Sequence, residues 1–242
     1  MGKIFVALLI TLMLTTSSTA EDQPAEGTTS VDPLEDGVAA YQRGDFATAL
    51  RLFQPLAERG DASAQCNIGV MYEQGRGVAQ NYREAMRWFR LAAVQGNSSA
   101  QSNLGVMYHK GQGIAQDYAE AMKWYRMAAE QRNPEAQFNL GVMFEEGRGV
   151  AQDRVRAHMW YNLAAAASTD ENAKLAARNR DTITKSLTRE QLFRAQEMAH
   201  NAKRAASRIA TEHDALPVWS FLPKSERASC RAPARFPAPA SV

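Results

Sequence analysis

The residue types that most often carry chemistry are few and scattered in this chain of 242 residues. Four histidines occur, at positions 109, 158, 200 and 213, and neither they nor the two cysteines have the close spacing of a zinc site. No Gly-x-Ser-x-Gly or Ser-x-x-Lys motif for a nucleophilic serine is present. We therefore expect no catalytic residue, no metal site and no cofactor.

Three Gly-x-Gly segments resemble phosphate-binding loops at first sight. None is followed by a third glycine or by Gly-Lys-Ser/Thr, which the nucleotide-binding motifs require. Formation of a tight turn explains them better, because the first glycine suits the left-handed residue that commonly ends a helix. The three segments are Gly75-Arg76-Gly77, Gly111-Gln112-Gly113 and Gly147-Arg148-Gly149.

The two cysteines, Cys66 and Cys230, are 164 residues apart. A disulfide between them is conceivable in an oxidising compartment. Because Cys230 lies in a tail with several prolines, the sequence slightly favours two free thiols.

The composition is that of a soluble globular protein, with 45% hydrophobic and 22% charged residues. The net charge is +2, and lysine and arginine do not cluster as they do on nucleic-acid-binding surfaces. We expect no nucleic-acid partner.

The first 20 residues have the pattern of a signal peptide. Lys3 provides the positive start, residues 4–14 are apolar apart from Thr11, and small residues precede a cleavage point after Ala20. An uncleaved anchor is the alternative, but 11 residues fall short of the ~20 that span a bilayer. We expect a periplasmic or secreted protein without stable membrane insertion after cleavage.

One six-residue motif recurs three times at a spacing of 36 residues. It begins at Asn67, Asn103 and Asn139 and reads Asn-Ile/Leu-Gly-Val-Met-Tyr/Phe. A fixed period of this length is the signature of a repeat architecture, in which stacked units share a continuous core. The apolar spacing within each unit is helical. The sequence therefore predicts an all-α solenoid of helix-turn-helix repeats.

The register divides the chain into consecutive segments. A disordered linker and a degenerate first repeat precede three full repeats, and a pair of capping helices and a disordered tail follow them. The tail contains an apolar cluster, Trp219 to Leu222, that either docks on the solenoid or engages a partner. The boundaries are 1–20, 21–36, 37–60, 61–96, 97–132, 133–168, 169–213 and 214–242.

Each full repeat is expected to contain the same local devices. A polar cap begins the first helix, and a glycine in its middle allows close approach of the neighbouring helix. Val78, Ile114 and Val150 fold under the loop as apolar plugs. Capping boxes are expected at Asn81 with Glu84 and at Asp117 with Glu120, in which each partner satisfies a free backbone N–H of the other.

The pattern of Ala64, Asn67, Gly69 and Tyr72, followed by the Gly-x-Gly loop, Ala85, Trp88 and Phe89, resembles the Sel1-like repeat, a relative of the tetratricopeptide repeats. The resemblance implies a right-handed superhelix with the first helix of each repeat on the concave side. It also implies an adaptor role in protein–protein contact. Some exported, cysteine-rich relatives act on β-lactams, but they carry a cysteine pair in each repeat.

We expect a ligand to contact positions at which the repeats keep their register but differ in side chain. On the concave face these candidate partner-binding residues are Cys66, Ser102 and Phe138; Glu73, His109 and Glu145; and Gln74, Lys110 and Glu146. The sequence predicts a non-enzymatic scaffold that binds a protein or peptide. A regulatory protein that inhibits or senses an envelope partner is the alternative, and a β-lactam or peptidoglycan hydrolase is a weaker one.

Overall fold

The computed structural model describes residues 32–167 and 170–214, with side chains up to Arg208. The predicted signal peptide, Cys230 and the Trp219 cluster lie outside these residues. Within the described ranges the chain forms ten helices and no strand. They are α1 (Pro33–Gln42), α2 (Phe46–Glu58), α3 (Ala62–Gln74), α4 (Tyr82–Val94), α5 (Ser98–Lys110), α6 (Tyr118–Glu130), α7 (Pro134–Glu146), α8 (Arg154–Ala167), α9 (Glu171–Thr184) and α10 (Arg189–Asp214).

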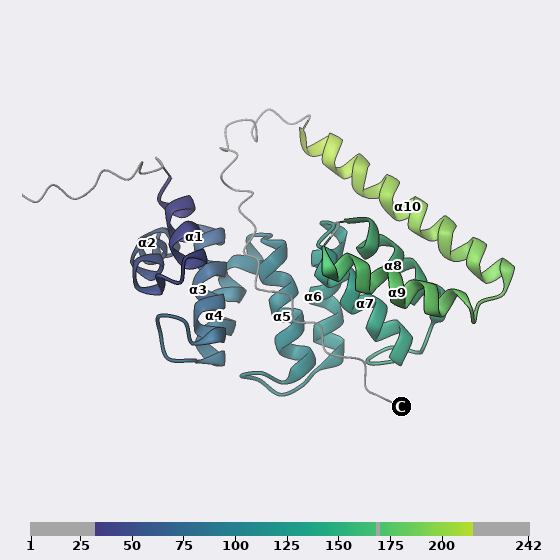
Figure 1. Cartoon of the computed structure of the whole chain (residues 1–242), viewed down its shortest axis with the longest axis horizontal. Helices are drawn as coiled ribbons and strands as arrows, with labels where there is room; N and C mark the ends of the chain where they lie inside the picture. The colour runs from purple at the N-terminus through teal and green to yellow at the C-terminus, as the bar shows by residue number, and fades with distance from the viewer. Residues whose placement is uncertain (1–31, 168–169, 215–242) are drawn as a thin grey trace, which may run out of the picture.

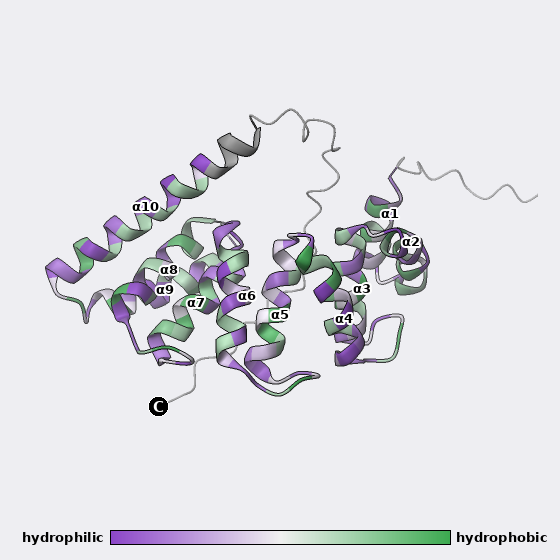
Figure 2. Cartoon of the chain, turned by 180° about the vertical axis from the view of Figure 1, so that it is seen from behind, coloured by the Kyte–Doolittle hydropathy of each residue, from purple (hydrophilic) through white to green (hydrophobic). Residues whose placement is uncertain are grey.

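The helices stack as a solenoid of successive pairs (Figure 1). The two helices of each full repeat pack closely, as α3 with α4, α5 with α6 and α7 with α8. Each pair then packs on the next through α4 with α5 and α6 with α7. Polar and apolar stretches alternate along these helices (Figure 2). The all-α solenoid predicted from the period is confirmed.

The first helices of the repeats lie on the inner side of the curve. Helix α5 contacts α7, and α7 contacts α9, whereas α4, α6 and α8 have no comparable contacts with one another within the described chain. Helices on the inside of a curved stack lie closer together than those on the outside. We call α3, α5 and α7 the inner helices and α4, α6 and α8 the outer helices.

Glycines in the inner helices admit an aromatic ring from the paired outer helix. A Cβ atom built on Gly105 would lie 2.4 Å from Tyr125, and one on Gly69 would lie 2.6 Å from Phe89. Real Cβ atoms do not approach so closely. The predicted close approach at these glycines is confirmed, and the ring of the outer helix is the group that requires it.

Side-chain caps begin the inner helices as the sequence predicts. Asp61, Asn97 and Asn133 accept hydrogen bonds from the backbone N–H three residues later. Each inner helix ends at a left-handed glycine, with φ of 68° at Gly75 and 69° at Gly111. A second left-handed residue lies in the turn between repeats: it is glycine at Gly60 and Gly96, and Arg132 takes its place before the third full repeat with a φ of 64°.

The loops close differently from the expected capping boxes. The N–H of Asn81 donates to the carbonyl of Tyr72 at 2.9 Å, and the N–H of Asp117 donates to Tyr108 at 2.9 Å. Because the end of the inner helix takes these N–H groups, Glu84 is not needed there and pairs with Arg87 instead. The reciprocal half of the predicted box is therefore wrong. The loop valines and isoleucine do pack under the loops as partly buried plugs.

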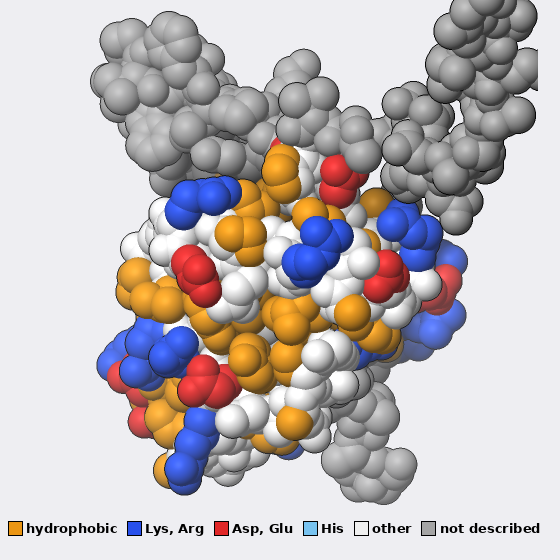
Figure 3. Space-filling view, turned by 90° about the vertical axis from the view of Figure 1, so that its left-hand side faces the viewer, with side chains coloured by type: hydrophobic (Ala, Val, Ile, Leu, Met, Phe, Trp, Pro, Cys, Tyr) orange, Lys and Arg blue, Asp and Glu red, His pale blue; other side chains and the backbone are white. Residues whose placement is uncertain are grey.

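The two ends of the solenoid are finished differently. At the N-terminal end, apolar side chains of α1 and α2 gather on the face that no earlier repeat covers (Figure 3). Helix α1 begins at Pro33, before the expected Gly37, because Asp32 caps it by accepting from Leu34 N–H at 2.9 Å. At the C-terminal end, α10 packs on α8 through Ala199, and a complete capping box between Thr188 and Gln191 begins it.

Candidate functional site

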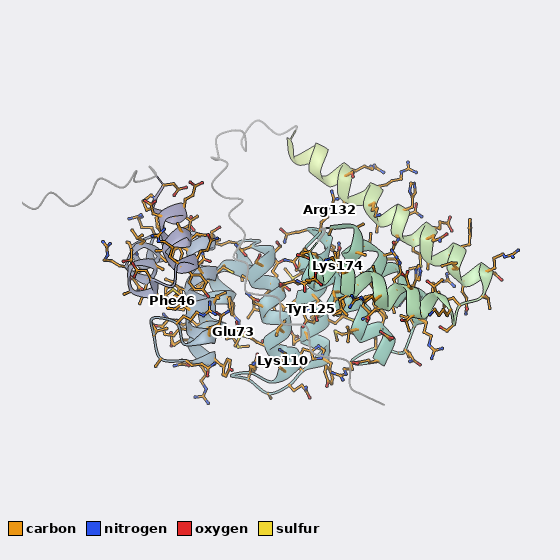
Figure 4. All side chains as sticks on the ribbon, in the orientation of Figure 1. Phe46, Glu73, Lys110, Tyr125, Arg132 and Lys174 are labelled. Atoms are coloured by element: carbon orange, nitrogen blue, oxygen red, sulfur yellow. The ribbon has the colours of Figure 1, made fainter. Side chains whose placement is uncertain are left out.

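The nine candidate positions fall into two groups along the inner helices. Cys66, Ser102 and Phe138 lie in the second turn of α3, α5 and α7. The other six lie in the last turn, beside the Gly-x-Gly loops; Figure 4 labels Glu73 and Lys110 at this loop end. We describe the second turn and the loop end separately because their environments differ.

The three candidates in the second turn are interior residues. Cys66 and Ser102 have no exposed surface, and Phe138 is 2% exposed, with its ring 5.4 Å from that of Tyr161. Variation at this position therefore changes what fills the core between the inner and outer helices. Whether any of the three contacts a partner stays a prediction.

Cys66 is disulfide-bonded. The expectation of a free thiol at this position is therefore wrong. The sequence argument failed because it weighed only the composition around Cys230, which says nothing of what surrounds Cys66.

At the first loop end, the candidate Gln74 is engaged by the preceding repeat. The hydroxyl of Tyr41 donates to Gln74 Oε1 at 2.8 Å and accepts from Arg76 Nη1 at 3.0 Å. The Arg76 guanidinium also lies 5.4 Å from the ring centres of Tyr41 and Phe46. This cluster joins α1 and α2 to the first full repeat.

Two repeats later, His109 and Arg148 form an equivalent junction. Arg148 Nη1 lies 3.1 Å from His109 Nε2, and Arg148 Nε lies 2.6 Å from Glu146 Oε2. A guanidinium can only donate, so Nε2 accepts and the neutral ring carries its hydrogen on Nδ1. The candidates His109 and Glu146 thus contact the same arginine, and the contact of His109 with Arg148 joins one repeat to the next.

The electrostatics of this junction keep His109 neutral. Burial, helped by the positive charges of Arg148 and Lys110, lowers the pKa of His109 from 6.5 to about 4. A histidine with this pKa stays uncharged across the physiological range. The other candidates here behave differently: Glu145 accepts from Tyr161 Oη at 2.7 Å, Glu73 is partly buried, and Lys110 is exposed.

The second turn also holds polar atoms that the sequence comparison overlooked. Asn67 Nδ2, Asn103 Nδ2 and Ser102 Oγ are buried and have no hydrogen-bond partner among the described residues. Buried polar groups are nearly always hydrogen-bonded, so unpartnered ones call for an explanation. We call these three residues the second-turn row.

The asparagines of the second-turn row point away from the outer helices. Gly69 faces the ring of Phe89 in the outer helix α4. At 100° per residue, Asn67 lies about 200° around α3 from Gly69, on the opposite side of the helix. Asn103 has the same relation to Gly105, which faces Tyr125 in α6. The two amides therefore lie on the inner face, one repeat apart.

The outer face is apolar in places and is covered only in part. Leu91, Met127 and Leu163 share one register position on α4, α6 and α8. Leu91 and Met127 are each 43% exposed, whereas Leu163 is buried against α10. A groove of about 320 Å³ lies between α10, α8 and the α6–α7 turn, lined by Arg132, Gln137, Leu163 and Ala202 among others.

The Sel1 repeat family matches the chain four times, at residues 34–61, 62–97, 98–133 and 134–168, which together exceed half of its length. The chain belongs to the Sel1 repeat family. Sel1-repeat proteins generally mediate protein–protein interaction. The match includes the degenerate first repeat that the sequence register indicates.

Two solved structures are similar to this Sel1 repeat protein. The protective antigen c5321 of uropathogenic Escherichia coli, which displays an SLR fold, is 32% identical with a TM-score of 0.59; 73% of the present chain is covered. That match covers 41% of c5321, so the chain spans about two fifths of its length. A Sel1 repeat protein from Oxalobacter formigenes is 26% identical with a TM-score of 0.54, covering 72% of this chain and 84% of that one. No protein of curated function matches the chain.

Residues 32–167 and 170–214 contain no group of three or more histidine, cysteine, aspartate or glutamate side chains placed to hold a metal ion. No helix in the part of the chain that the structure describes is long and apolar enough to cross a membrane.

Proposed function

We propose that this Sel1 repeat protein is an exported, non-enzymatic scaffold that holds an extended protein segment on its inner face. The observation that carries the proposal is the second-turn row, in which Asn67 and Asn103 offer unpartnered amide donors one repeat apart. Membership of the Sel1 repeat family supports a protein partner. The signal-like residues 1–20 support export to the periplasm or beyond.

The spacing of the donors suits an extended chain. Helix α4 packs on both α3 and α5, and packed helices lie about 8–10 Å apart. An extended chain advances about 3.3 Å per residue, so a segment that crosses from α3 to α5 would bring a carbonyl to each amide within about six residues. Each such carbonyl would give a buried N–H the hydrogen bond that it lacks.

The contacts that polar side chains already make at the loop end favour the second-turn row as the binding site. Gln74, His109 and Glu145 already bind Tyr41, Arg148 and Tyr161. A ligand there would have to displace those contacts. His109 is also a poor candidate for a catalytic base, because its Nε2 accepts from Arg148 and its pKa is lowered to about 4.

The proposal is tested with peptides selected from a random library on the full mature chain, in the presence and absence of a thiol reductant. Two amide hydrogen bonds are worth about 1–3 kcal/mol together, so Asn67→Ala with Asn103→Ala should weaken binding by about 5- to 150-fold. The exposed control Ala119→Ser on α6 should leave affinity unchanged.

Two results would count against this assignment. Unchanged affinity in the double asparagine variant would remove the second-turn row from the binding site. A loss of affinity in Lys110→Ala alone would move the site to the loop end. Export is checked separately by sequencing the N-terminus of the secreted protein, which should begin at Glu21.

A further inference from the structure

Buried glutamines recur in the first turn of the inner helices and are held in the same way in two repeats. The Nε2 atoms of Gln65 and Gln101 donate to backbone carbonyls of the preceding repeat, at 3.0 and 3.1 Å. Their Oε1 atoms accept from the Nε2 atoms of Gln95 and Gln131, at 2.8 Å in both cases. Both ends of each buried carboxamide are therefore hydrogen-bonded.

Gln137 holds the same position in the third full repeat but lacks half of this arrangement. Its Nε2 donates to the carbonyl of Ala129 at 3.2 Å, whereas its buried Oε1 has no hydrogen-bond partner among the described residues. The cause is a substitution, because Ala167 stands 36 residues after Gln131, where the earlier repeats have glutamine. A carbonyl can only accept, so Nε2 points to Ala129 and the unpartnered oxygen faces the position of Ala167.

The unpartnered acceptor lies at an apolar groove. Gln137, which is only 5% exposed, and Ala167 both line the groove of about 320 Å³ between α10, α8 and the α6–α7 turn. This volume is at the lower end of the ~300–1,000 Å³ that is typical of ligand pockets. The groove thus combines a buried hydrogen-bond acceptor with an apolar wall. Residues of that wall include Trp160, Leu163, Ala166, Ala202 and Ala206.

The rim of the groove has a net positive charge. Arg132, labelled in Figure 4, and Lys203 line it together with Glu130. Arg132 takes the left-handed conformation that glycine takes in the two earlier turns. A side chain in this conformation costs stability, and such strain is concentrated at functional sites. Arg132 and Ala167 thus both depart from the earlier repeats, and both line the same groove.

We propose that this groove binds a glutamine-bearing segment of a partner protein. Gln95 and Gln131 show within this chain which group fits the acceptor, namely a glutamine carboxamide whose N–H donates to Oε1. A glutamine of the partner donates to Gln137 Oε1 in the same way, its apolar neighbours cover α8 and α10, and an acidic residue beside it pairs with Arg132. The groove is separate from the second-turn row.

Binding is measured by fluorescence anisotropy with the full mature chain and a labelled peptide, Met-Ala-Ala-Glu-Gln, capped as an amide. This probe reproduces residues 127–131, which end in the glutamine that binds the equivalent acceptor one repeat earlier. A second probe with methionine in place of the glutamine should bind about 3- to 10-fold more weakly, because it lacks the donor. Absence of saturable binding of the first probe, or equal affinity of the two, would overturn the proposal.

Ala167→Gln gives the sharpest test because it restores the glutamine of the earlier repeats. The new side chain should donate to Gln137 Oε1, raise the melting temperature and lower the affinity for the first probe by about 10-fold or more. Unchanged affinity would overturn the proposal, whatever the melting temperature.

Gln137→Met removes the acceptor and should weaken binding of the first probe by about 3- to 10-fold. Gln101→Met is the matched control, because it removes the same buried carboxamide one repeat earlier, away from the groove, and should leave the affinity unchanged. Equal losses in the two variants would assign the effect to packing between repeats and overturn the proposal.

Arg132→Gly should raise the melting temperature, because glycine takes the left-handed conformation without strain. The same change should weaken probe binding, by less at high salt than at low salt. Unchanged affinity would contradict the pairing of an acidic residue with Arg132. Asn67→Ala with Asn103→Ala should bind the probe as the wild type does, so failure of this site and failure of the proposed function give different results.

Discussion

The two ends of the inner helices differ in the partners of their polar side chains, although the loop end also holds two buried polar atoms without a partner, His109 Nδ1 and Gln112 Oε1. At the loop end, side chains that change from repeat to repeat bind the neighbouring repeat, as Gln74 binds Tyr41 and His109 binds Arg148. In the second turn, Asn67 and Asn103 leave amide donors unpartnered. Variation between repeats therefore marks two of the junctions of this solenoid, and we propose that the recurring asparagines mark the face that binds a ligand.

Substitution of Gly105, which lies between the second turn and the loop end of α5, should have the largest effect on stability. Leucine at position 105 would collide with Tyr125, since even a Cβ atom there lies 2.4 Å from the ring. Overpacking of this kind should lower the free energy of unfolding by about 3 kcal/mol. Denaturant unfolding of Gly105→Leu measures it, with the exposed substitution Ala119→Leu as the control. An unchanged unfolding midpoint would show that the packing of Gly105 against Tyr125 does not stabilise the fold.

Acid should weaken the loop-end junction at His109. Its folded pKa of about 4 lies below the unfolded value of 6.5, so the unfolded chain binds the proton more tightly. The stability from neutral His109 is complete above about pH 6.5 and is lost as the pH falls to about 4. The loss should reach up to about 3 kcal/mol.

His109→Gln isolates this contribution, because glutamine keeps an acceptor for Arg148 and does not titrate. Unfolding of both proteins between pH 7 and pH 4 should show a steeper loss in the wild type. Parallel curves would show that the histidine junction does not control acid stability.

Loop-end and second-turn substitutions should have opposite consequences. Arg148→Met removes its contacts with His109 and Glu146 and should cost about 1–2 kcal/mol of stability without changing peptide affinity. Asn103→Ala removes an unpartnered buried amide, so it should leave stability nearly unchanged and weaken binding. Thermal unfolding and titration of the same two proteins measure both quantities. If each variant lost both stability and affinity, the loop end and the second turn would not have the separate structural and binding roles that we propose.

A surface ion pair provides the smallest expected effect. Arg156 lies 3.4 Å from Asp153, one helical turn away, and its side chain is half exposed. Because exposed pairs of this kind contribute little, Arg156→Met should change the free energy of unfolding by less than about 0.5 kcal/mol. This variant is the matched control for Arg148→Met in denaturant unfolding, and a loss as large as that of Arg148→Met would remove the special role of the junction.

The repeat register predicted most of the fold because each of the structural features that it implies depends on residues close in sequence. The 36-residue period, the helix caps at Asn97 and Asn133 and the glycines opposite aromatic rings depend on residues within one or two helices. The loop closure was less predictable: Tyr72 and Asn81 meet only after the chain has turned. Sequence spacing suggested a nearer partner, Glu84, which binds Arg87 instead.

The candidate site was harder to predict because it depends on neighbours 30 or more residues away. The bond between Tyr41 and Gln74 and that between His109 and Arg148 cannot be read from either residue alone. The signal for the second-turn row was present in the recurring Asn67 and Asn103. It was masked because a residue that recurs in each repeat is usually explained by packing.

We propose that the second-turn amides bind an extended segment. The nitrogen-15 NMR spectrum of the side-chain amides tests this when the full mature chain is titrated with a library-selected peptide. Signals of Asn67 and Asn103, assigned by their loss in the alanine variants, should shift on binding while those of Gln74 and Gln112 stay in place. Shifts at Gln74 and Gln112 with none at the asparagines would contradict the account and place the binding site at the loop end.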